Sequence, residues 1–474
     1  MTLQAAKIRT LKSNSISDKL GKSHFILIFV MSLFYFVAFY YVDLLSLTVW
    51  STNIWDVLFD GRLLDYYIYS AENHSGLVHY YVGVEWIALL PWAVWNFPMW
   101  IISKLAGVNI ASSHLTLLWS KLFLVVMLCF VLYYVSKIAL VITKSKTAAT
   151  WAVFITAGSM FTYGAVYYAG QTDIFFVLLG LIGIYELLAH RNEKRFLLFF
   201  ALSLIIKPFY LFILIPILLL FEKNLLKILL KIGLCFGGLM LAKLLMLPFP
   251  FYLESLYLGP SIIELGKFLL PSIPIFGSNS HLDASIFITL YLLVCIFCYL
   301  KKSSLEDEKF ATWMLYVSSA VLLIFSIFVT STFYRTMMLV PILSLVIASN
   351  PKRFKMNMMF TLVLTFCIPI ISILSGEALY VPGSMFANLD KDAMAQSVMV
   401  NYIPDARTMD YIANFFGGIA LGSVIFLVFA NYPHRRIEKF VEGEKCERFI
   451  IWIYTLLPIV FALYSAGLKF VLGI

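Results

Sequence analysis

The stretch that decides the fold class is residues 170–221, GQTDIFFVLLGLIGIYELLAHRNEKRFLLFFALSLIIKPFYLFILIPILLLF. Its first apolar run ends in the basic turn His190–Arg195, and its second run is interrupted by Lys207-Pro208. Apolar runs of about 18 residues or more are long enough to cross a bilayer as helices. Proline removes a helix hydrogen bond, so it predicts a break at Lys207. Basic residues flank both ends of the second run, which indicates a re-entrant hairpin whose two ends lie on the cytoplasmic side.

The rest of the chain has the same character. Hydrophobic residues make up 62% of the 474 residues and charged residues 13%, against about 45–50% and about 25% in soluble proteins. This composition excludes a soluble enzyme, a disordered chain and a nucleic-acid-binding protein. The net charge of +9 is explained by basic residues in cytoplasmic loops. We therefore expect residues 1–474 to form one all-α polytopic unit in the cell membrane, with membrane lipids as its surroundings.

Charge patterning predicts the topology. The N-terminal segment is basic and leads into an apolar run at 25–42 without a small-residue cleavage site, so we expect an uncleaved first span and a cytoplasmic N-terminus. The Trp-rich segment 84–103 is predicted to be juxtamembrane, and 148–167 to be one outward span. The count is roughly 11–13 transmembrane helices, with about eleven full spans, including re-entrant and juxtamembrane helices. Three external loops are predicted at 43–114, 248–283 and 375–410.

The residues suited to chemistry lie mostly in predicted external positions. The first loop is rich in acids, the helix at 174 is entered through Gly170-Gln171-Thr172-Asp173, and Lys207 and Arg335 lie beside apolar runs. Charges near membrane depth are costly and are commonly functional. We therefore expect an extracytoplasmic active site in which acids move protons and bases hold a lipid phosphate.

In three stretches the sequence resembles the GT-C superfamily, the integral-membrane glycosyltransferases that use polyprenyl-phosphate-linked sugars. The first is Asp43 after the first span, followed by an amphipathic stretch to Phe59-Asp60-Gly61. The second is the order of elements in 170–221, which is typical of bacterial members, and the third is Phe333-Tyr334-Arg335 opening an apolar helix. The resemblance covers most of residues 1–350.

The resemblance implies a GT-C fold, inversion at the anomeric carbon and an external Asp as general base for the acceptor hydroxyl. Asp43 is the first choice, because it lies at the outer end of the first span, with Asp56 and Asp65 as the alternatives. Asp60 precedes a glycine, where a turn residue is the simpler interpretation. Some members use a divalent metal, so a metal cofactor stays open, although no metal-ligand spacing is present in this sequence.

Each of the remaining candidates has two interpretations. Lys207 either binds a phosphate or acceptor or extends its stem to the interface, and Arg335 either binds the donor phosphate or is a flanking charge. Gln171 and Asp173 either line the site or cap the helix that follows. Tyr66 and Tyr67 either stack on sugar rings or anchor the chain at the membrane interface. Lys121 and Lys243 lie within apolar runs, where bundle packing or lipid contact is the simpler interpretation.

The expected function is transfer of a sugar from a polyprenyl-phosphate donor to a hydroxyl of a glycan, lipid or protein acceptor on the outer face. Two other classes remain open. A lipid-linked glycan flippase would more often show duplicated halves and charges at several mid-span positions. A glycan polymerase or ligase would place its main loop late in the chain and rely on arginines, whereas here the first loop is the largest and is acidic.

Overall fold

The structure is a computed structural model. It describes residues 20–40, 42–73, 81–110, 113–258, 272–274, 283–301, 303–329, 333–374, 383–384, 406–433 and 448–472. Within these ranges the chain is almost entirely helical, and its buried side chains form one continuous apolar core.

The protein is an all-α polytopic membrane protein. Seven helices in the described ranges are long and apolar enough to cross a bilayer. They are α4 (Trp86–Ala106), α5 (His114–Thr143), α8 (Asp173–His190), α11 (Leu225–Met246), α15 (Phe310–Phe328), α17 (Phe354–Leu374) and α20 (Ala406–Ala430). Large apolar side chains stay exposed on the outermost of them, such as Leu229, Leu234 and Leu241 on α11. Such faces are suited to contact with lipid tails.

An eighth candidate span is broken. α6 (Lys146–Gly158) ends at Ser159, whose side chain caps the short α7 (Met160–Thr162), and a π-helix, η3 (Tyr163–Ala169), follows. The two halves are bent by 51°. The single continuous span predicted for 148–167 is therefore wrong in detail, because the break is made by a serine cap that hydropathy does not detect.

Several other predicted spans are shorter apolar helices of 10–17 described residues, so fewer helices pass a length criterion than the sequence predicts. These are α1 (Lys22–Ala38), η4 with α10 (Pro208–Tyr210, Leu211–Phe221), α14 (Ile286–Leu300), α16 (Val340–Ser349) and α21 (Arg448–Leu472, described side chains to Leu463). The remaining helical elements are α2 (Val42–Phe59), η2 (Leu63–Asp65), α3 (Tyr66–Glu72), α9 (Glu193–Ile206), α12 (Tyr252–Leu258), η5 (Phe333–Met338) and η6 (Pro351–Arg353).

Two short antiparallel strand pairs join loops to this bundle. β1 (Phe39–Tyr40) pairs with β4 (Gly383–Ser384), and β2 (Ser272–Pro274) pairs with β3 (Asp283–Ser285). The first pair ends the predicted first span at Ala38 rather than at residue 42, because the backbone turns from helix to strand there. Most of the predicted loops 248–283 and 375–410 lies outside the described residues.

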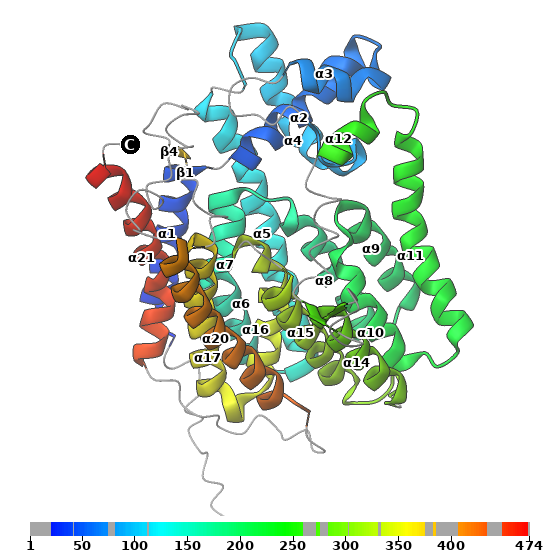
Figure 1. The fold of residues 1–474 in the computed structure, drawn as a ribbon, viewed down its shortest axis with the longest axis vertical. Helices are drawn as coiled ribbons and strands as arrows, with labels where there is room; N and C mark the ends of the chain where they lie inside the picture. The colour runs from blue at the N-terminus through cyan, green and yellow to red at the C-terminus, as the bar shows by residue number, and fades with distance from the viewer. Residues whose placement is uncertain are drawn as a thin grey trace, which may run out of the picture.

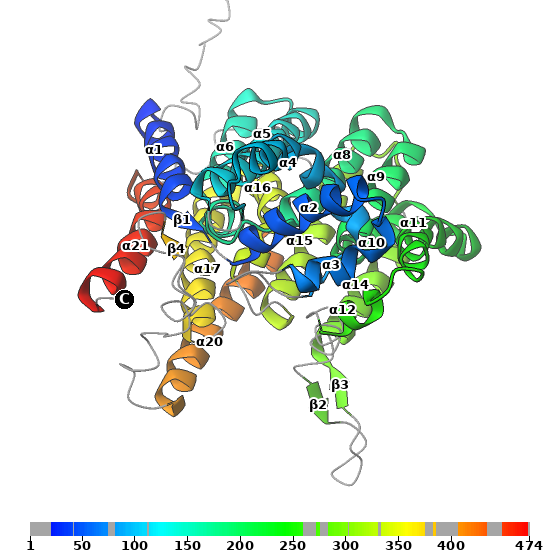
Figure 2. The same ribbon diagram turned by 90° about the horizontal axis from the view of Figure 1, so that it is seen from above.

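We call one end of the bundle the cap end, because α2, α3, α4 and α12 lie across it (Figure 1). Seen from above, α2, α3 and α4 cross over the helix ends (Figure 2). The predicted first loop is therefore a helical layer. α4 packs beside α2 and is long and apolar enough to span a bilayer, so its juxtamembrane position stays a prediction.

The opposite end, which we call the base end, contains the turn between α8 and α9 and the turn between α10 and α11 (Figure 1). Lys231 lies 2.5 Å from Glu193 and 2.9 Å from Glu222. Glu193 is the first residue of α9, and Glu222 follows the last residue of α10. Both ends of the segment 193–221 therefore lie close together. The chain turns back between them at Lys207, where the backbone is extended (φ −154°). The predicted break at Lys207-Pro208 and the return of the chain are thereby confirmed, whereas the re-entrant position of this hairpin in the membrane stays a prediction.

The hairpin is shorter than a bilayer is thick. α9 has 14 residues, or about 21 Å at about 1.5 Å per residue, against a hydrocarbon core of about 30 Å. Its tip lies beside the first residue of α8, because Lys207 contacts Asp173. This places an ammonium group beside the start of a membrane-length helix.

Candidate active site at the cap end

The site begins with the turn between η3 and α8. The π-helix ends at Gly170, which has a left-handed backbone (φ 68°), and the N–H of Gln171 donates to Ala165 O at 2.9 Å. A β-carbon at Gly170 would lie 2.6 Å from Cβ of Leu44. The turn therefore packs directly on the first turn of α2, and only glycine allows that approach.

This close packing brings Gln171 to Asp43. Gln171 Nε2 donates a hydrogen bond to Asp43 Oδ2, between residues 128 positions apart in the chain. Asp43 lies in the first turn of α2 and is half-buried. An amide that donates to one carboxylate oxygen orients the group.

Two residues further on, Asp173 meets Lys207. Lys207 Nζ contacts Asp173 Oδ1; the Asp173 side chain is fully buried, whereas that of Lys207 is 19% exposed. The ammonium therefore lies at the boundary between the packed interior and the accessible side of the cap end. An ion pair at this depth needs mutual compensation, since either charge alone would be costly to bury.

The structure thus brings together four of the residues that the sequence singled out: Asp43, Gln171, Asp173 and Lys207. They come from three regions of the chain, and Gln171 and Asp173 link the two pairs because they share one turn. The alternative interpretation of Gln171 and Asp173 as helix caps is not the one found. Thr172 holds the N-cap position of α8 and makes no side-chain cap bond.

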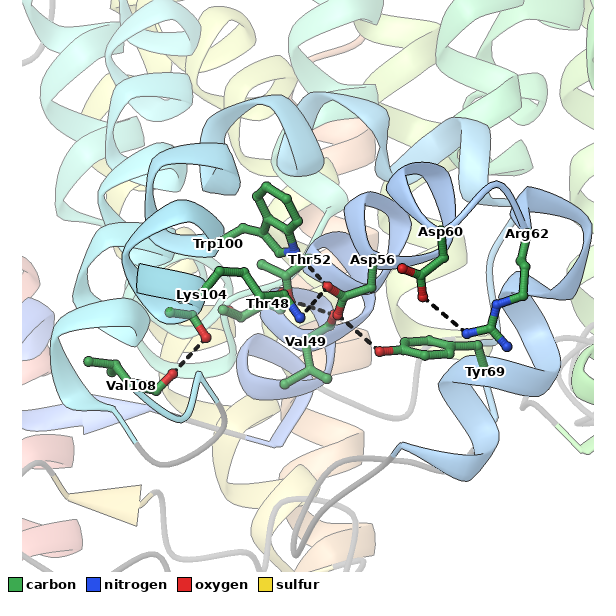
Figure 3. Close-up of polar contacts among 11 residues, drawn as sticks. Thr48, Val49, Thr52, Asp56, Asp60, Arg62, Tyr69, Trp100, Lys104 and Val108 are labelled. Atoms are coloured by element: carbon green, nitrogen blue, oxygen red, sulfur yellow. Dashed lines mark hydrogen bonds and ion pairs between the residues drawn. The ribbon is translucent and has the colours of Figure 1, made fainter. Parts of the chain in front are cut away.

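Asp56 has a different environment, shown in Figure 3. Its Oδ1 lies 2.7 Å from Lys104 Nζ and accepts from Trp100 Nε1 at 2.7 Å, and its Oδ2 accepts from Tyr69 OH at 3.1 Å. Burial, with the nearby Asp56 charge, raises the pKa of Tyr69 to about 12, so this phenol stays a donor. With three donors already in place, Asp56 ties α2, α3 and α4 together.

The other first-loop candidates lie away from the hydrogen bonds of the four-residue cluster. Asp65 is half-buried at the start of α3. Tyr66 and Tyr67 are 0% exposed, their rings are 5.1 Å apart, and their hydroxyls donate to Trp50 O and Val84 O. This is the environment of core residues rather than of a surface on which a sugar stacks.

Arg335 belongs to η5, which packs against η3 and the beginning of α8. Phe333 lies against Gly164 so closely that a β-carbon there would be 2.3 Å from the ring. Tyr210 OH donates to Met338 O at 3.2 Å, which joins η5 to the hairpin tip. Arg335 itself is half-buried. Its element is therefore packed on η3 and α8, the two helices that flank the turn with Gln171.

Two lysines that the sequence left to packing have defined partners. Lys121 is fully buried in α5, and its Nζ donates to the carbonyls of Tyr35, Phe36 and Phe39. Lys243 Nζ lies 2.5 Å from the buried Glu85 at the start of α4. Neither the contact of Lys121 nor that of Lys243 could be predicted from a local sequence pattern, because their partners lie far away in the chain.

Within the described residues no group of three or more His, Cys, Asp or Glu side chains could hold a metal ion. No protein-family model matches the chain, and no curated protein or solved structure matches it either.

Proposed function

We propose that the protein is a membrane glycosyltransferase that moves a sugar from a polyprenyl phosphate to a hydroxyl of a glycan, lipid or protein acceptor on the outer face. The single observation that supports this most is the cluster of Asp43, Gln171, Asp173 and Lys207 at the cap end. Its one turn joins the Asp43 carboxylate, through Gln171, to the Lys207 ammonium, through Asp173, and so supplies a proton acceptor and a phosphate ligand from linked pairs.

In the proposed reaction Asp43 accepts the proton of the acceptor hydroxyl. The hydroxyl oxygen bonds to the anomeric carbon while the bond from that carbon to the phosphate oxygen breaks, so the configuration inverts. A general base must lie within hydrogen-bond reach of the proton that it removes. Gln171 positions the Asp43 carboxylate for this by donating to one of its oxygens.

The leaving polyprenyl phosphate keeps the electron pair and needs positive charge nearby. Lys207 supplies it in this proposal. An ammonium has three N–H donors, and the contact with Asp173 uses one of them. Arg335, on the element packed against η3 and α8, is the second candidate for the donor phosphate.

The test uses purified full-length protein in liposomes with radiolabelled undecaprenyl-phosphate hexoses and pentoses, an envelope extract as acceptor source, and released undecaprenyl phosphate as readout. Removing a general base typically lowers the rate by about 10²–10⁴-fold, so we expect Asp43→Asn to show that loss. The matched control is Asp60→Asn, whose carboxylate is exposed and pairs with Arg62 at 3.1 Å.

Full activity of Asp43→Asn would remove the base assignment. Movement of labelled lipid across the vesicle without release of undecaprenyl phosphate would instead identify a flippase. Transfer of a whole glycan chain from a lipid-linked oligosaccharide would identify a polymerase or ligase.

A further inference from the structure

We infer that Lys121 is a positioning residue: its buried ammonium holds the end of α1 and so sets where Asp43 stands relative to Gln171. A role of Lys121 in catalysis rests on the function proposed above, whereas its effect on the position of Asp43 relative to Gln171 does not. Lys121 lies in α5, 78 positions from Asp43 along the chain, and touches neither substrate nor reacting atoms in this proposal.

The contacts of Lys121 match its chemistry. Its Nζ donates to Tyr35 O at 2.7 Å, to Phe36 O at 2.9 Å and to Phe39 O. Three acceptors satisfy the three donors of an ammonium. They lie at and just beyond the C-terminal end of α1, where Tyr35 O also accepts from the N–H of Phe39 and where the helix dipole favours a cation. A buried lysine is thus stabilised there by backbone carbonyls.

The place that Lys121 holds is the junction that carries Asp43. α1 ends at Ala38, β1 covers Phe39–Tyr40, and α2 starts at Val42, so Asp43 is four residues beyond the last anchored carbonyl. The neighbouring residue of α5 anchors the other side of the junction. Ser120 Oγ donates to Asn96 Oδ1 at 2.8 Å, and Asn96 Nδ2 donates to Ser51 Oγ of α2 at 2.9 Å.

One turn of α5 therefore fixes both helices that flank the junction: α1 through Lys121 and α2 through Ser120 and Asn96. Without Lys121, the carbonyls of Tyr35, Phe36 and Phe39 would lose this donor. The position of the junction would then depend on the remaining contacts, such as the hydrogen bond from Tyr35 OH to Pro458 O and the pairing of β1 with β4. The hydrogen bond between Asp43 and Gln171 depends on the first turn of α2, and so does the packing of Leu44 on Gly170.

The chain contains a matched control for this role. Lys223 Nζ also donates to three backbone carbonyls, those of Leu219, Cys298 and Lys301. Its contacts are at the base end, away from Asp43. Lys121→Met and Lys223→Met each remove a lysine bonded to carbonyls, but only the first affects the junction before α2.

The experiment measures the geometry directly. Asp43→Cys and Gln171→Cys are combined in the full-length protein, and the rate of their linkage by a short bis-methanethiosulfonate reagent is followed by mass spectrometry. Because the second, intramolecular reaction of the reagent is fast only when the two thiols are held close together, we expect Lys121→Met to slow linkage by roughly 10-fold. Lys223→Met should leave the rate within about 2-fold, and Lys121→Arg should recover most of it.

An unchanged linkage rate in Lys121→Met, or an equal slowing in Lys223→Met, would overturn the inference. If Lys121→Met does not fold, Lys121→Gln, which keeps two donors on a shorter side chain without the charge, replaces it, and the same slowing is expected. In the enzyme with native Asp43 and Gln171, Lys121→Met should lower kcat roughly 10²-fold with KM for the lipid donor unchanged. Linkage does not require sugar transfer, so failure of the proposed function would be observed separately.

Discussion

At the residue scale, the site depends on side-chain contacts between residues that are far apart in the sequence. Asp43 and Asp56 are both acids of the first predicted loop, yet their environments differ. Asp43 accepts a hydrogen bond from the Gln171 amide, whereas Asp56 is contacted by three donors. Asp43 could be chosen from the sequence through its place after the first span. The three donors around Asp56 could not be predicted from the sequence, because Trp100 and Lys104 contact it from a different helix.

Gly170 offers a sharp test at this scale. Gly170→Ala adds the strain of a left-handed backbone, about 1–2 kcal/mol, and overpacking against Leu44, about 1–3 kcal/mol. Gly107→Ala is the control, because Gly107 has φ 66° and a β-carbon there would meet nothing within 4 Å. We expect thermal unfolding in detergent to shift more for Gly170→Ala. Equal shifts would show that the close approach to α2 is not a constraint.

At the element scale, the hairpin of α9 and α10 is the feature that the sequence predicts best. Flanking bases and Lys207-Pro208 located its break, and the contacts of Lys231 with Glu193 and Glu222 bring its ends together. The break between α6 and η3 escaped prediction, because the capping Ser159 is one polar residue within an apolar run. Periodicity and hydropathy average over such a residue.

The closure of the hairpin should depend on pH through Glu222. The backbone N–H of Asn224, followed by the ammonium of Lys231, lowers the pKa of Glu222 from 4.5 to about 2. A lowered pKa in the folded state adds stability above the unfolded pKa, and this is lost as pH falls toward 2.

Glu222→Gln should therefore melt below the wild-type protein at pH 7, and the difference should shrink between pH 4.5 and the lowest pH that the detergent sample tolerates. Thermal unfolding at several pH values measures this. The exposed Glu308→Gln serves as control, with a small difference throughout. A gap for Glu222→Gln that is constant or widens in acid would contradict the prediction.

At the scale of the whole molecule, polar contacts sort the helix ends into two groups. Asp43, Asp173 and Glu85 make theirs at the cap end, and Glu193 and Glu222 make theirs at the base end. Which end faces the cytoplasm stays a prediction of the positive-inside bias.

Side-specific labelling tests that orientation. With the six native cysteines replaced by serine, Asn73→Cys at the cap end should react with an impermeant maleimide in intact cells. Glu308→Cys, in the turn before α15, should react only after permeabilisation. Both sites are exposed, so access to reagent is comparable. The reverse pattern would invert the predicted topology and move the proposed chemistry to the other face.

The sequence by itself determined the membrane class, the alternation of helices and the break at Lys207, because hydropathy, charge bias and proline act locally along the chain. Only the tertiary structure decided which charges meet. It joined Asp43 to Gln171 across 128 residues, seated the buried Lys121 on the end of α1, and enclosed Tyr66 and Tyr67 in the core. The physical reason is that a buried polar group must be satisfied by a partner that is close in space. In a mostly apolar sequence, no local pattern identifies a partner that lies far away along the chain.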